Sequence, residues 1–568
     1  MGFDDLIPDL GGFGRYQIFS LLTFMIFFGP NGWQHIITVF IAGRIPHWCN
    51  VPELEHLNHS TFLHIAVPLE ENQYGEAVYS QCRVYDFNYS SMGNITAEDV
   101  ANWKPNGNIS TRKCSGYIYD TSKFSSTLVS QYDLVCDRNW LYTLAASAFM
   151  AGLFCGAFFS GTLADRFGRQ RIFSIMLMLQ LLSTLGAALV PNYAAFLVLR
   201  GFVGLSSLGT YQTLMAYILE VIPKEARSKG FFILMLGRSA RGLLVLWAYF
   251  IRSHVHLQIM ASLCFIPALI ATFLLSESPR WLMATGRLKE AEKVCRRIAR
   301  INGVKLPENF NINKFTEVED ETASDGNKKN ATLFDLFRTP RLRKRTILSY
   351  CLWFSVVFFS YGLGLNIEKI IPGDIYLNMF LMMFVNEVGS LVIGYVALFK
   401  LKRRVVVSAW LIIAGISVVV MAPVLLLNIS GIVIALGLIA SVVVANLWAL
   451  VYLYSGELFP TVVRTIGMGS GSSVGRLGGL ITPQLPLLGE IWYGLPYIVL
   501  GIVPIVVGVL VLCLPETKGQ RLPDTLEEAE LFGTAEYNNR GSEMGALTSI
   551  NKIPGPVLNN NVQDNGEP

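Results

Sequence analysis

The chain has 568 residues, of which 52% are hydrophobic and 15% charged, and its formal net charge is +4. Its mean hydropathy is +0.45, and its charged fraction is well below the roughly 25% of soluble proteins. The composition therefore argues against a soluble multidomain protein and predicts a polytopic membrane protein.

Apolar runs long enough to cross a membrane recur along the chain. A helix needs about 20 apolar residues to span roughly 30 Å of hydrocarbon. The first run, from about Tyr16, is too long to be the core of a signal peptide. Twelve spans are predicted, over residues 16–43, 139–163, 171–190, 194–218, 229–251, 256–276, 346–366, 376–399, 405–427, 432–455, 463–486 and 492–514.

The first loop, residues 44–138, has two features of an oxidising, glycosylating compartment. It contains four Asn-x-Ser/Thr sites, at Asn58, Asn88, Asn94 and Asn108. It also contains four cysteines, Cys49, Cys82, Cys114 and Cys136. These predict two disulfides, although four cysteines allow three pairings. The loop is therefore expected to be extracellular.

The basic residues of the short loops predict the same orientation. They follow spans 2 and 8, at Arg166, Arg169, Arg171 and Lys400–Arg404, whereas the loops after spans 3 and 9 have none. The N-terminal residues 1–15, the loop 277–345 and the tail 515–568 are therefore expected in the cytosol. We expect a multi-pass protein of the plasma membrane.

The cytosolic loop contains a basic amphipathic segment, RLKEAEKVCRRIARI, at residues 287–301. Its pattern predicts a helix that lies along the membrane surface. The tail 515–568 is expected to be largely disordered, because residues after about Phe532 are rich in Asn, Gly and Pro.

An internal repeat divides the spans into two sets of six. Glu220-x-x-Pro223-x-x-x-Arg227 follows span 4, and Glu457-x-x-Pro460-x-x-x-Arg464 follows span 10. Spans 6 and 12 are likewise followed by the similar tripeptides SES and PET. A nearly constant offset between these landmarks indicates two parallel six-helix halves, which can rock about a site at the bilayer midplane.

The charged turns at the cytosolic ends of the spans are candidate gates. Asp165 and Arg169 could pair across helix ends when the cytosolic side is closed, and Glu220 or Glu457 could pair with a basic partner. The predicted gating residues are Asp165, Arg169, Glu220, Arg227, Glu457 and Arg464. The alternative is that these are solvated loop charges of little energetic weight.

Several longer motifs resemble those of the major facilitator superfamily: GTLADRFGRQR, the two ExxPxxxR turns, SESPRWL and LPETKGQRLPDT. The segments TLVSQYDLVCDRNWL and YSGELFPTVVRTIGMGSGSSVGRLGG, with the long first loop, resemble the organic ion transporter family. The segments PNGW, AYFIR and HWCNVPE are most similar to its carnitine and zwitterion branch. The resemblance implies an all-α membrane protein of the major facilitator fold. It also implies alternating access, with no cofactor and no covalent chemistry.

Charged residues inside a membrane cost at least about 2.5–3.5 kcal/mol each and are candidate functional residues. Arg476 lies halfway along span 11. The resemblance implies arginine here in the anion and carnitine branches and aspartate in the cation branch. Its guanidinium can bind a carboxylate through two parallel bonds, and the alternative is a structural pair with Glu387 of span 8.

Span 5 adds Arg238 and Arg241 on one helix face. Three alternative roles are open for this pair of arginines. They bind an anionic substrate, they cap a cytosolic gate, or they form ion pairs within a bundle. With Glu387 as the one clear carboxylate inside a span, the pathway is expected to be electropositive. This favours organic anions or carboxylate-bearing zwitterions. The alternative is a cation held by Glu387 and an aromatic cage.

Aromatic candidates for the pathway are Trp33, Tyr211, Tyr361 and Tyr452. His35 is interpreted as an interfacial residue at the outer end of span 1 rather than a proton carrier. The resemblance to carnitine-type members implies a candidate sodium site at Asn31, Gln180, Thr210 and Tyr211. Thr210 replaces the expected asparagine, so exchange and facilitated transport remain alternatives.

Other classes of protein fit less well. The sequence lacks a GxxxxGK[ST] loop and a soluble region large enough for a nucleotide domain, which argues against an ATP-driven pump. It also lacks a recognisable catalytic constellation, which argues against an enzyme. A membrane receptor is a remote alternative. The expected partners are a small organic ion and the lipid membrane, with no nucleic acid and a monomeric chain.

Overall fold

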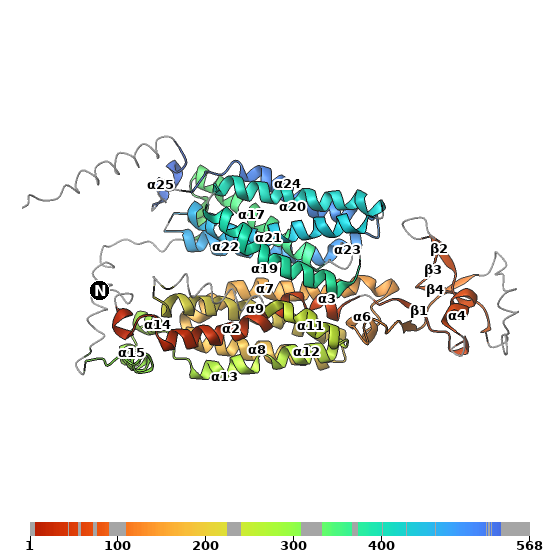
Figure 1. Ribbon diagram of the computed structural model, residues 1–568, viewed down its shortest axis with the longest axis horizontal. Helices are drawn as coiled ribbons and strands as arrows, with labels where there is room; N and C mark the ends of the chain where they lie inside the picture. The colour runs from red at the N-terminus through yellow and green to blue at the C-terminus, as the bar shows by residue number, and fades with distance from the viewer. Residues whose placement is uncertain are drawn as a thin grey trace, which may run out of the picture.

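The computed structural model describes residues 6–43, 45–54, 58–71, 77–89, 110–223, 226, 240–307, 310, 332–365, 373–399, 401–427, 429–460, 462–518, 520, 523 and 525–534. Its body is an elongated bundle of helices that run in roughly the same direction, and a small lobe from the first loop projects from one end (Figure 1). We call this end the loop end. The opposite end, where the N-terminus, α15 and α25 lie, is the terminal end.

The bundle consists of two layers that correspond to the two halves of the chain (Figure 1). The first half contains α2 (Arg15–Ile36), α3 (Thr38–Ile41), α7 (Leu144–Phe167), α8 (Arg169–Leu189), α9 (Tyr193–Val221), η6 (Ala240–Gly242), α11 (Leu243–Phe250), α12 (His254–Leu263) and α13 (Ile266–Leu274). The second half contains α17 (Pro340–Leu365), α19 (Ile375–Phe399), α20 (Arg403–Leu426), α21 (Ser430–Leu458), α22 (Arg464–Ile481), η9 (Thr482–Gln484), α23 (Leu485–Leu488) and α24 (Leu495–Val511).

Small residues allow helices within a half to approach closely. A Cβ added at Gly152 of α7 would lie 1.9 Å from the Gly201 carbonyl oxygen of α9, and one at Gly204 would lie 2.1 Å from the Phe149 carbonyl oxygen. Backbone-to-backbone packing of this kind is how helices associate where lipid removes the hydrophobic driving force. A larger side chain at either glycine would push α7 and α9 apart.

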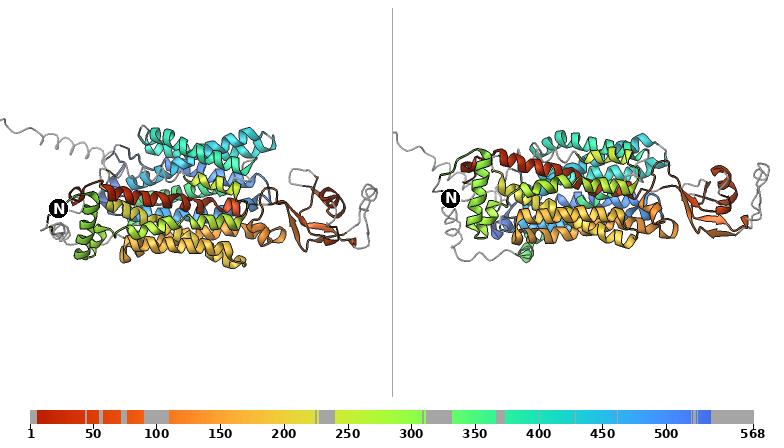
Figure 2. Two further views of the ribbon diagram at one scale, coloured as in Figure 1. Left: turned by 60° about the horizontal axis from the view of Figure 1, so that its bottom comes forward. Right: turned by 90° about the horizontal axis from the view of Figure 1, so that it is seen from below.

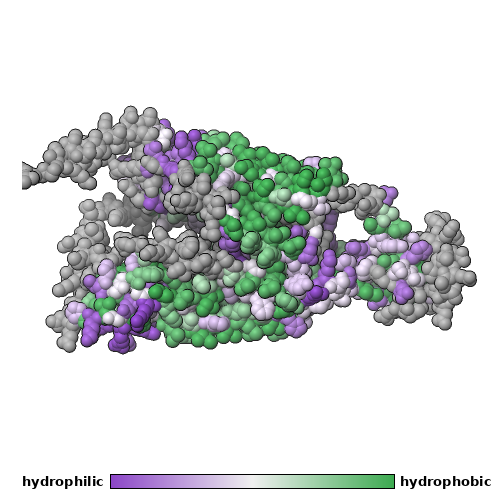
Figure 3. Space-filling model, viewed as in Figure 1, coloured by the Kyte–Doolittle hydropathy of each residue, from purple (hydrophilic) through white to green (hydrophobic). Residues whose placement is uncertain are grey.

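Seven helical segments in the described part of the chain are long and apolar enough to cross a membrane: Cys136–Phe167, Arg169–Leu189, Tyr193–Val221, His254–Leu274, Pro340–Leu365, Arg403–Leu426 and Ser430–Leu458. Three shorter apolar helices, Ala240–Phe250, Ile375–Gly389 and Leu495–Val511, lie among them. Apolar side chains cover the middle of the visible face, and hydrophilic ones gather toward both ends (Figure 3). The expected count of twelve spans stays a prediction.

The body of the chain is helical as expected, and the lobe adds three two-stranded antiparallel sheets that the sequence did not predict. The pairs are β1 (His47–Cys49) with β6 (Tyr117–Tyr119), β2 (Leu69–Glu71) with β3 (Ala77–Tyr79), and β4 (Arg83–Tyr85) with β5 (Thr111–Lys113). Short helices accompany them: η2 (Pro52–Leu54), α4 (His59–Ala66), α6 (Leu128–Gln131) and η4 (Cys136–Thr143). Strands this short carry too little alternation for a sequence pattern to reveal them.

Disulfides Cys49–Cys114 and Cys82–Cys136 close the lobe, so the prediction of two disulfides is confirmed and the pairing is resolved. Of the four glycosylation candidates, Asn58 and Asn88 are exposed. Asn94 and Asn108 lie outside the described residues. Glycosylation itself stays a prediction.

At the terminal end, the predicted amphipathic helix forms as α15 (Leu288–Asn302), beside η1 (Pro8–Leu10) and α14 (Pro279–Ala284). It crosses the ends of the bundle helices (Figure 2). Its apolar residues Ala291, Cys295, Ile298 and Ala299 are buried in one cluster with residues of η1, α2 and α14. The apolar face of α15 therefore packs on protein, and the expectation that the helix lies along the membrane surface stays a prediction. Periodicity revealed the apolar face but not the protein segment that covers it.

The first part of the C-terminal tail contains α25 (Leu526–Leu531), which docks on the start of α17 next to η8 (Leu333–Phe337). The buried Arg345 donates hydrogen bonds to the carbonyl oxygens of Ala529 and Phe532. Glu530 accepts from the backbone N–H of Arg341 at 3.1 Å. These contacts hold α25 against the start of α17, and the expected disorder of the tail stays a prediction. Residues after 534 lie outside the described part.

Candidate substrate pathway between the two halves

The two halves meet at the loop end. Thr143 of η4 donates to Gln484 Oε1 of η9 at 2.9 Å, and Gln484 Nε2 donates to Ser147 Oγ of α7 at 3.1 Å. Phe40 of α3 stacks on Tyr376 of α19, with ring centroids 5.8 Å apart. These contacts join the halves on the side of the lobe.

The motif PNGW on α2 organises the contact between α2 and its neighbours. The Asn31 amide oxygen accepts hydrogen bonds from Ser207 Oγ at 2.7 Å and from Gln180 Nε2 at 2.9 Å. A Cβ at Gly32 would lie 2.3 Å from Cγ of Arg241, so glycine makes room for the arginine stem. The buried Trp33 donates to the Ala240 carbonyl oxygen at 3.0 Å. Trp33 therefore anchors η6 rather than projecting freely into a pathway.

His35 is one turn beyond Asn31 on the same face of α2, and the structure corrects its assignment as an interfacial residue. Its Nδ1 lies 3.1 Å from Tyr361 Oη of α17, and the two rings are stacked. Its Nε2 lies 3.4 Å from Ser207 Oγ of α9. The imidazole therefore bridges the two halves, which its position near a helix end could not reveal.

Arg476 is 7% exposed on α22, and its charge acts on both His35 and Tyr361. Its Nε finds no hydrogen-bond partner among the described residues. A buried guanidinium nitrogen without a partner costs free energy unless a ligand satisfies it. Arg476 is thus a fixed donor at the boundary of the halves.

Arg241 and Glu387 form an ion pair across the halves, with Nη2 and Oε1 3.1 Å apart and side chains 35% and 29% exposed. Glu387 therefore pairs with Arg241 in this structure, and the alternative of a structural ion pair between Glu387 and Arg476 is not observed. Arg238, the other predicted arginine of span 5, lies outside the described residues.

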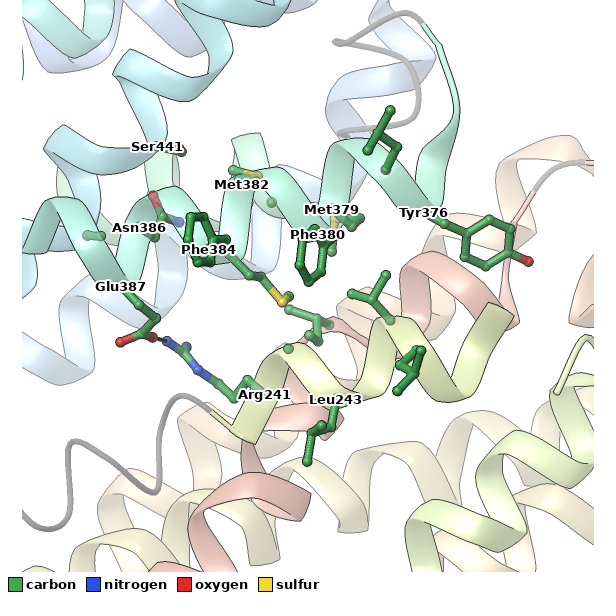
Figure 4. A pocket seen from close by; sticks show the side chains of 18 of the residues that line it. Arg241, Leu243, Tyr376, Met379, Phe380, Met382, Phe384, Asn386, Glu387 and Ser441 are labelled. Carbon is green, nitrogen blue, oxygen red and sulfur yellow. Dashed lines mark hydrogen bonds and ion pairs between the residues drawn. The ribbon is translucent and has the colours of Figure 1, made fainter. Parts of the chain in front are cut away.

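The Arg241–Glu387 pair lines a cavity of about 680 Å³ between α11 and α19 (Figure 4). Apolar and aromatic side chains form most of the wall, among them Leu243, Met379, Met382, Phe380 and Phe384. Its volume is in the range of small-molecule sites, roughly 300–1,000 Å³. Arg476, Tyr361 and Tyr211 are not part of its lining.

The other predicted aromatic residues are spread more widely. Tyr211 packs edge-on against Phe28, with centroids 5.8 Å apart. Tyr452 is 42% exposed and packs at a right angle on Trp353 at 4.6 Å. Only Tyr361 of the four lies at the contact with His35. The structure therefore does not bring the aromatic candidates together as one cage.

The candidate sodium residues offer few free oxygens. Both acceptor positions of the Asn31 amide oxygen are taken, and the Thr210 hydroxyl donates to the Ser206 carbonyl oxygen of its own helix at 2.6 Å. Gln180 Oε1 is the amide oxygen that has no partner among the described residues. Sodium needs several convergent oxygens, so these residues do not fit a sodium cage in this conformation.

Arg200 of α9 is a buried charge that sequence reasoning missed. It is 1% exposed and donates to Gln34 Oε1 at 3.0 Å and to Thr38 Oγ1 at 2.8 Å. Its guanidinium lies 4.6 Å from the ring centroid of Phe149. It makes no ion pair within the described part of the chain. Its location inside span 4 was the signal that could have identified it.

At the terminal end of the first half, the predicted gating residues come together. Arg169 lies 2.5 Å from Asp165 Oδ1 and 3.1 Å from Glu220 Oε1. Glu277 accepts from the backbone N–H groups of Arg169 and Gln170 at 2.8 and 2.9 Å. Glu277 was visible in the repeated tripeptide but was not predicted as a partner. Arg227 lies outside the described residues.

The second half repeats this cluster with Arg403, Glu457 and Glu516. Arg403 Nε lies 3.8 Å from Glu457 Oε2, and Glu516 accepts from the backbone N–H of Arg403 at 2.9 Å. Arg464 instead donates to the Phe459 carbonyl oxygen at 3.3 Å. The partner of Glu457 is therefore Arg403 of the degenerate basic turn.

The sugar (and other) transporter family model matches residues 88–529. The chain is 32% identical over 535 residues to the organic cation/carnitine transporter 2 of Mus musculus, covering 93% of each chain. It is 30% identical over 558 residues to an organic cation transporter protein of Drosophila melanogaster, covering 97% of this chain and 98% of the relative.

The fold is similar to that of the inward-open xylose transporter XylE from E. coli. The TM-score is 0.59 at 14% identity, and the match covers 91% of this chain and all of the bacterial one. At this identity the likeness describes the fold alone.

Proposed function

Because the chain belongs to the major facilitator superfamily, and within it to the organic ion transporter family, it is a membrane transporter and not an enzyme, and we propose that it carries carboxylate-bearing organic ions. The substrates would be organic anions or carnitine-like zwitterions. The observation that carries the proposal is Arg476, a buried guanidinium at the boundary of the halves whose Nε has no partner among the described residues.

The balance of charge around Arg476 supports an anionic group in the substrate. Arg476, Arg241 and Arg200 all act on the ring of His35. The nearby carboxylate, Glu387, is already paired with Arg241. An incoming carboxylate would meet unbalanced positive charge in a medium of low dielectric constant, where such attraction is strong.

The Arg241–Glu387 pair also suits a zwitterion. The pair is about one-third exposed toward the cavity, so a ligand with both charges could exchange partners with it. The cation would approach Glu387 and the carboxylate would approach Arg241 or Arg476. This agrees with relatives named organic cation/carnitine transporters.

Alternating access would follow from the two halves. We infer twelve spans: the seven long apolar segments, the three shorter apolar helices, and α2 and α22, which pack within the same layers. The loop end would face the outside of the plasma membrane and the terminal end the cytosol. The contacts at the loop end would then close the outer side, and the clusters around Arg169 and Arg403 would act at the cytosolic side.

An uptake experiment with three labelled probes tests the substrate class: benzoate as an anion, carnitine as a zwitterion and tetraethylammonium as a cation. Arg476→Ala should lower kcat/KM for the transported carboxylate by about 10-fold or more, since a charge-assisted hydrogen bond contributes about 1.5–3 kcal/mol. Arg476→Lys should recover part of the loss, because it keeps the charge but not the fork.

Arg300→Ala, an exposed arginine of α15, is the matched control and should transport normally. Surface biotinylation separates loss of transport from loss of expression. Wild-type carboxylate uptake by Arg476→Ala would contradict the proposal. Uptake of tetraethylammonium alone would favour the organic cation alternative, in which Glu387→Gln should abolish transport.

A further inference from the structure

A groove of about 600 Å³ lies at the terminal end of the first half. Most of its wall belongs to α15, which crosses the ends of the bundle helices there (Figure 2). Ser276, which follows the end of α13, also lines it. The groove shares no lining residue with the cavity at Arg241 and Glu387. It is therefore separate from the candidate substrate pathway.

The wall that α15 contributes to the groove is basic. Its positively charged side chains include Lys289, Lys293, Arg296 and Arg297. Positions three and four residues apart share one face of a helix, and the opposite, apolar face of α15 is buried on protein. Glu292, the acidic residue of the lining, is already paired with Arg296 at 2.8 Å. The groove therefore carries an excess of positive charge.

Many N–H donors of these side chains have no acceptor. Within the described part of the chain, Lys289 and Lys293 form no ion pair. Arg297 donates from Nη2 to the Leu274 carbonyl oxygen at 3.0 Å, which uses one of the five donors of a guanidinium. Phosphate oxygens suit such a set, because a guanidinium binds them in pairs and an ammonium binds them as a point charge.

A buried hydroxyl in the same lining gives independent evidence for a ligand. Ser276 is 6% exposed, and both of its backbone groups are held by tyrosines. Its N–H donates to Tyr16 Oη at 3.0 Å, and its carbonyl oxygen accepts from Tyr217 Oη at 2.7 Å. Its Oγ finds no hydrogen-bond partner among the described residues. Since buried polar groups are normally satisfied, this hydroxyl indicates a polar ligand in the groove.

The surface beside the groove indicates that the ligand is a lipid. The helix α13 ends the apolar segment His254–Leu274, which is long enough to cross a membrane. Its side chains Ile270, Phe273 and Leu274 are 60%, 70% and 53% exposed. At the terminal end, hydrophilic surface borders this apolar kind of surface (Figure 3). A lipid could place its headgroup in the groove and its acyl chains along α13, whereas a soluble anion would leave the apolar surface unused.

We propose that the groove binds the headgroup of an anionic membrane lipid of the phosphoinositide class. Clusters of lysine and arginine at the cytosolic surface attract such lipids. A headgroup with several phosphates matches the convergent cations, whereas the single net charge of phosphatidylserine would satisfy only part of them. The inference takes from the proposed function only the cytosolic position of the terminal end. It does not depend on Arg476 or on the transported solute.

Native mass spectrometry of the full-length protein in detergent, titrated with phosphatidylinositol bisphosphate, measures the affinity. The paired substitution Lys293→Ala with Arg297→Ala should weaken binding about 10-fold or more, because each basic side chain at a lipid surface contributes about fivefold. Ser276→Ala should weaken binding about threefold, the value of one neutral hydrogen bond. Its thermal unfolding should be unchanged, because the hydroxyl has no partner among the described residues.

The matched control is Arg343→Ala with Lys344→Ala, at the start of α17 in the second half. These two side chains are also exposed and basic, and the arginine likewise donates to a backbone carbonyl oxygen. The control should keep its affinity within about twofold. If the paired variant on α15 folds poorly, Lys293→Ala alone should still show a loss of about fivefold.

Three results would overturn the proposal. Absence of lipid binding, or equal losses in the two paired variants, would remove the site. Soluble inositol trisphosphate should bind at least about 10-fold more weakly than the lipid, because it lacks acyl chains, and equal affinity would make a soluble phosphate the ligand. Phosphatidylserine that binds as tightly as the bisphosphate would overturn the lipid class. Each of these results leaves the proposed function standing, because none of them measures uptake.

Discussion

The terminal ends of the two halves hold an arginine and two glutamates in corresponding positions, but with different geometry. In the first half, Arg169 lies 3.1 Å from Glu220 and 2.5 Å from Asp165. In the second half, Arg403 lies 3.8 Å from Glu457, whose Oε2 also accepts from the Thr517 hydroxyl at 2.5 Å. Among the contacts between described side chains, two ion pairs contribute to the first cluster, and one long pair and a hydroxyl contribute to the second.

The turn that precedes each arginine explains part of the difference. Gly168 has φ of +110°, and its lack of a Cβ lets Glu277 approach the start of α8. Lys402, at the corresponding place, has an ordinary φ of −72°. The sequence of the second half also has Phe399 where the first has Asp165. The shared scaffold therefore preserves the positions of the charges, while the turn decides how tightly they are held.

The largest expected effect comes from removing the arginine of the tight cluster. Arg169→Ala leaves Glu220 partly buried without its partner, and breaking a buried pair costs about 3–5 kcal/mol. Arg403→Ala should cost less, roughly 1–2 kcal/mol, because Glu457 keeps its hydroxyl partner and a single hydrogen bond contributes about 1 kcal/mol. Thermal unfolding of the purified proteins measures both, and equal losses of stability would show that the geometric difference has no energetic weight.

A smaller effect is expected at the turn. Gly168→Ala places a Cβ 2.4 Å from Glu277 Oε2, in a backbone conformation that costs a residue with a Cβ about 1–3 kcal/mol. Lys402→Ala is the matched variant in the second half, where a change within about 0.5 kcal/mol is expected. The same unfolding assay applies. If Gly168→Ala leaves the free energy of unfolding unchanged, the Glu277 side chain can move away from the added Cβ without destabilising the protein.

The smallest effect is expected at Asp165, whose side chain is 71% exposed although it lies 2.5 Å from Arg169. Water and salt screen such a pair, so Asp165→Asn should change stability by no more than about 1 kcal/mol. Unfolding at low and high ionic strength would reveal the screened part. A loss as large as that of Arg169→Ala would show that Asp165, rather than Glu220, holds the arginine.

The sequence by itself determined the features that depend on local pattern or on comparison of the chain with itself. The apolar runs indicated a membrane protein, and the repeated ExxPxxxR turns indicated two related halves. The amphipathic segment formed the helix α15 that its periodicity predicts. The position of Arg476 inside an apolar run was enough to identify it as a candidate, because a charge inside a span is costly wherever its side chain points.

Only the tertiary structure decided which side chains meet across the chain. The partner of Glu387, the pairing of the four cysteines and the protein cover over α15 all depend on residues far apart in sequence. His35 shows the reason most directly. Its contacts lie 172 and 326 positions away, and the direction of a side chain around a helix in a two-layer bundle is set by packing rather than by its neighbours in sequence.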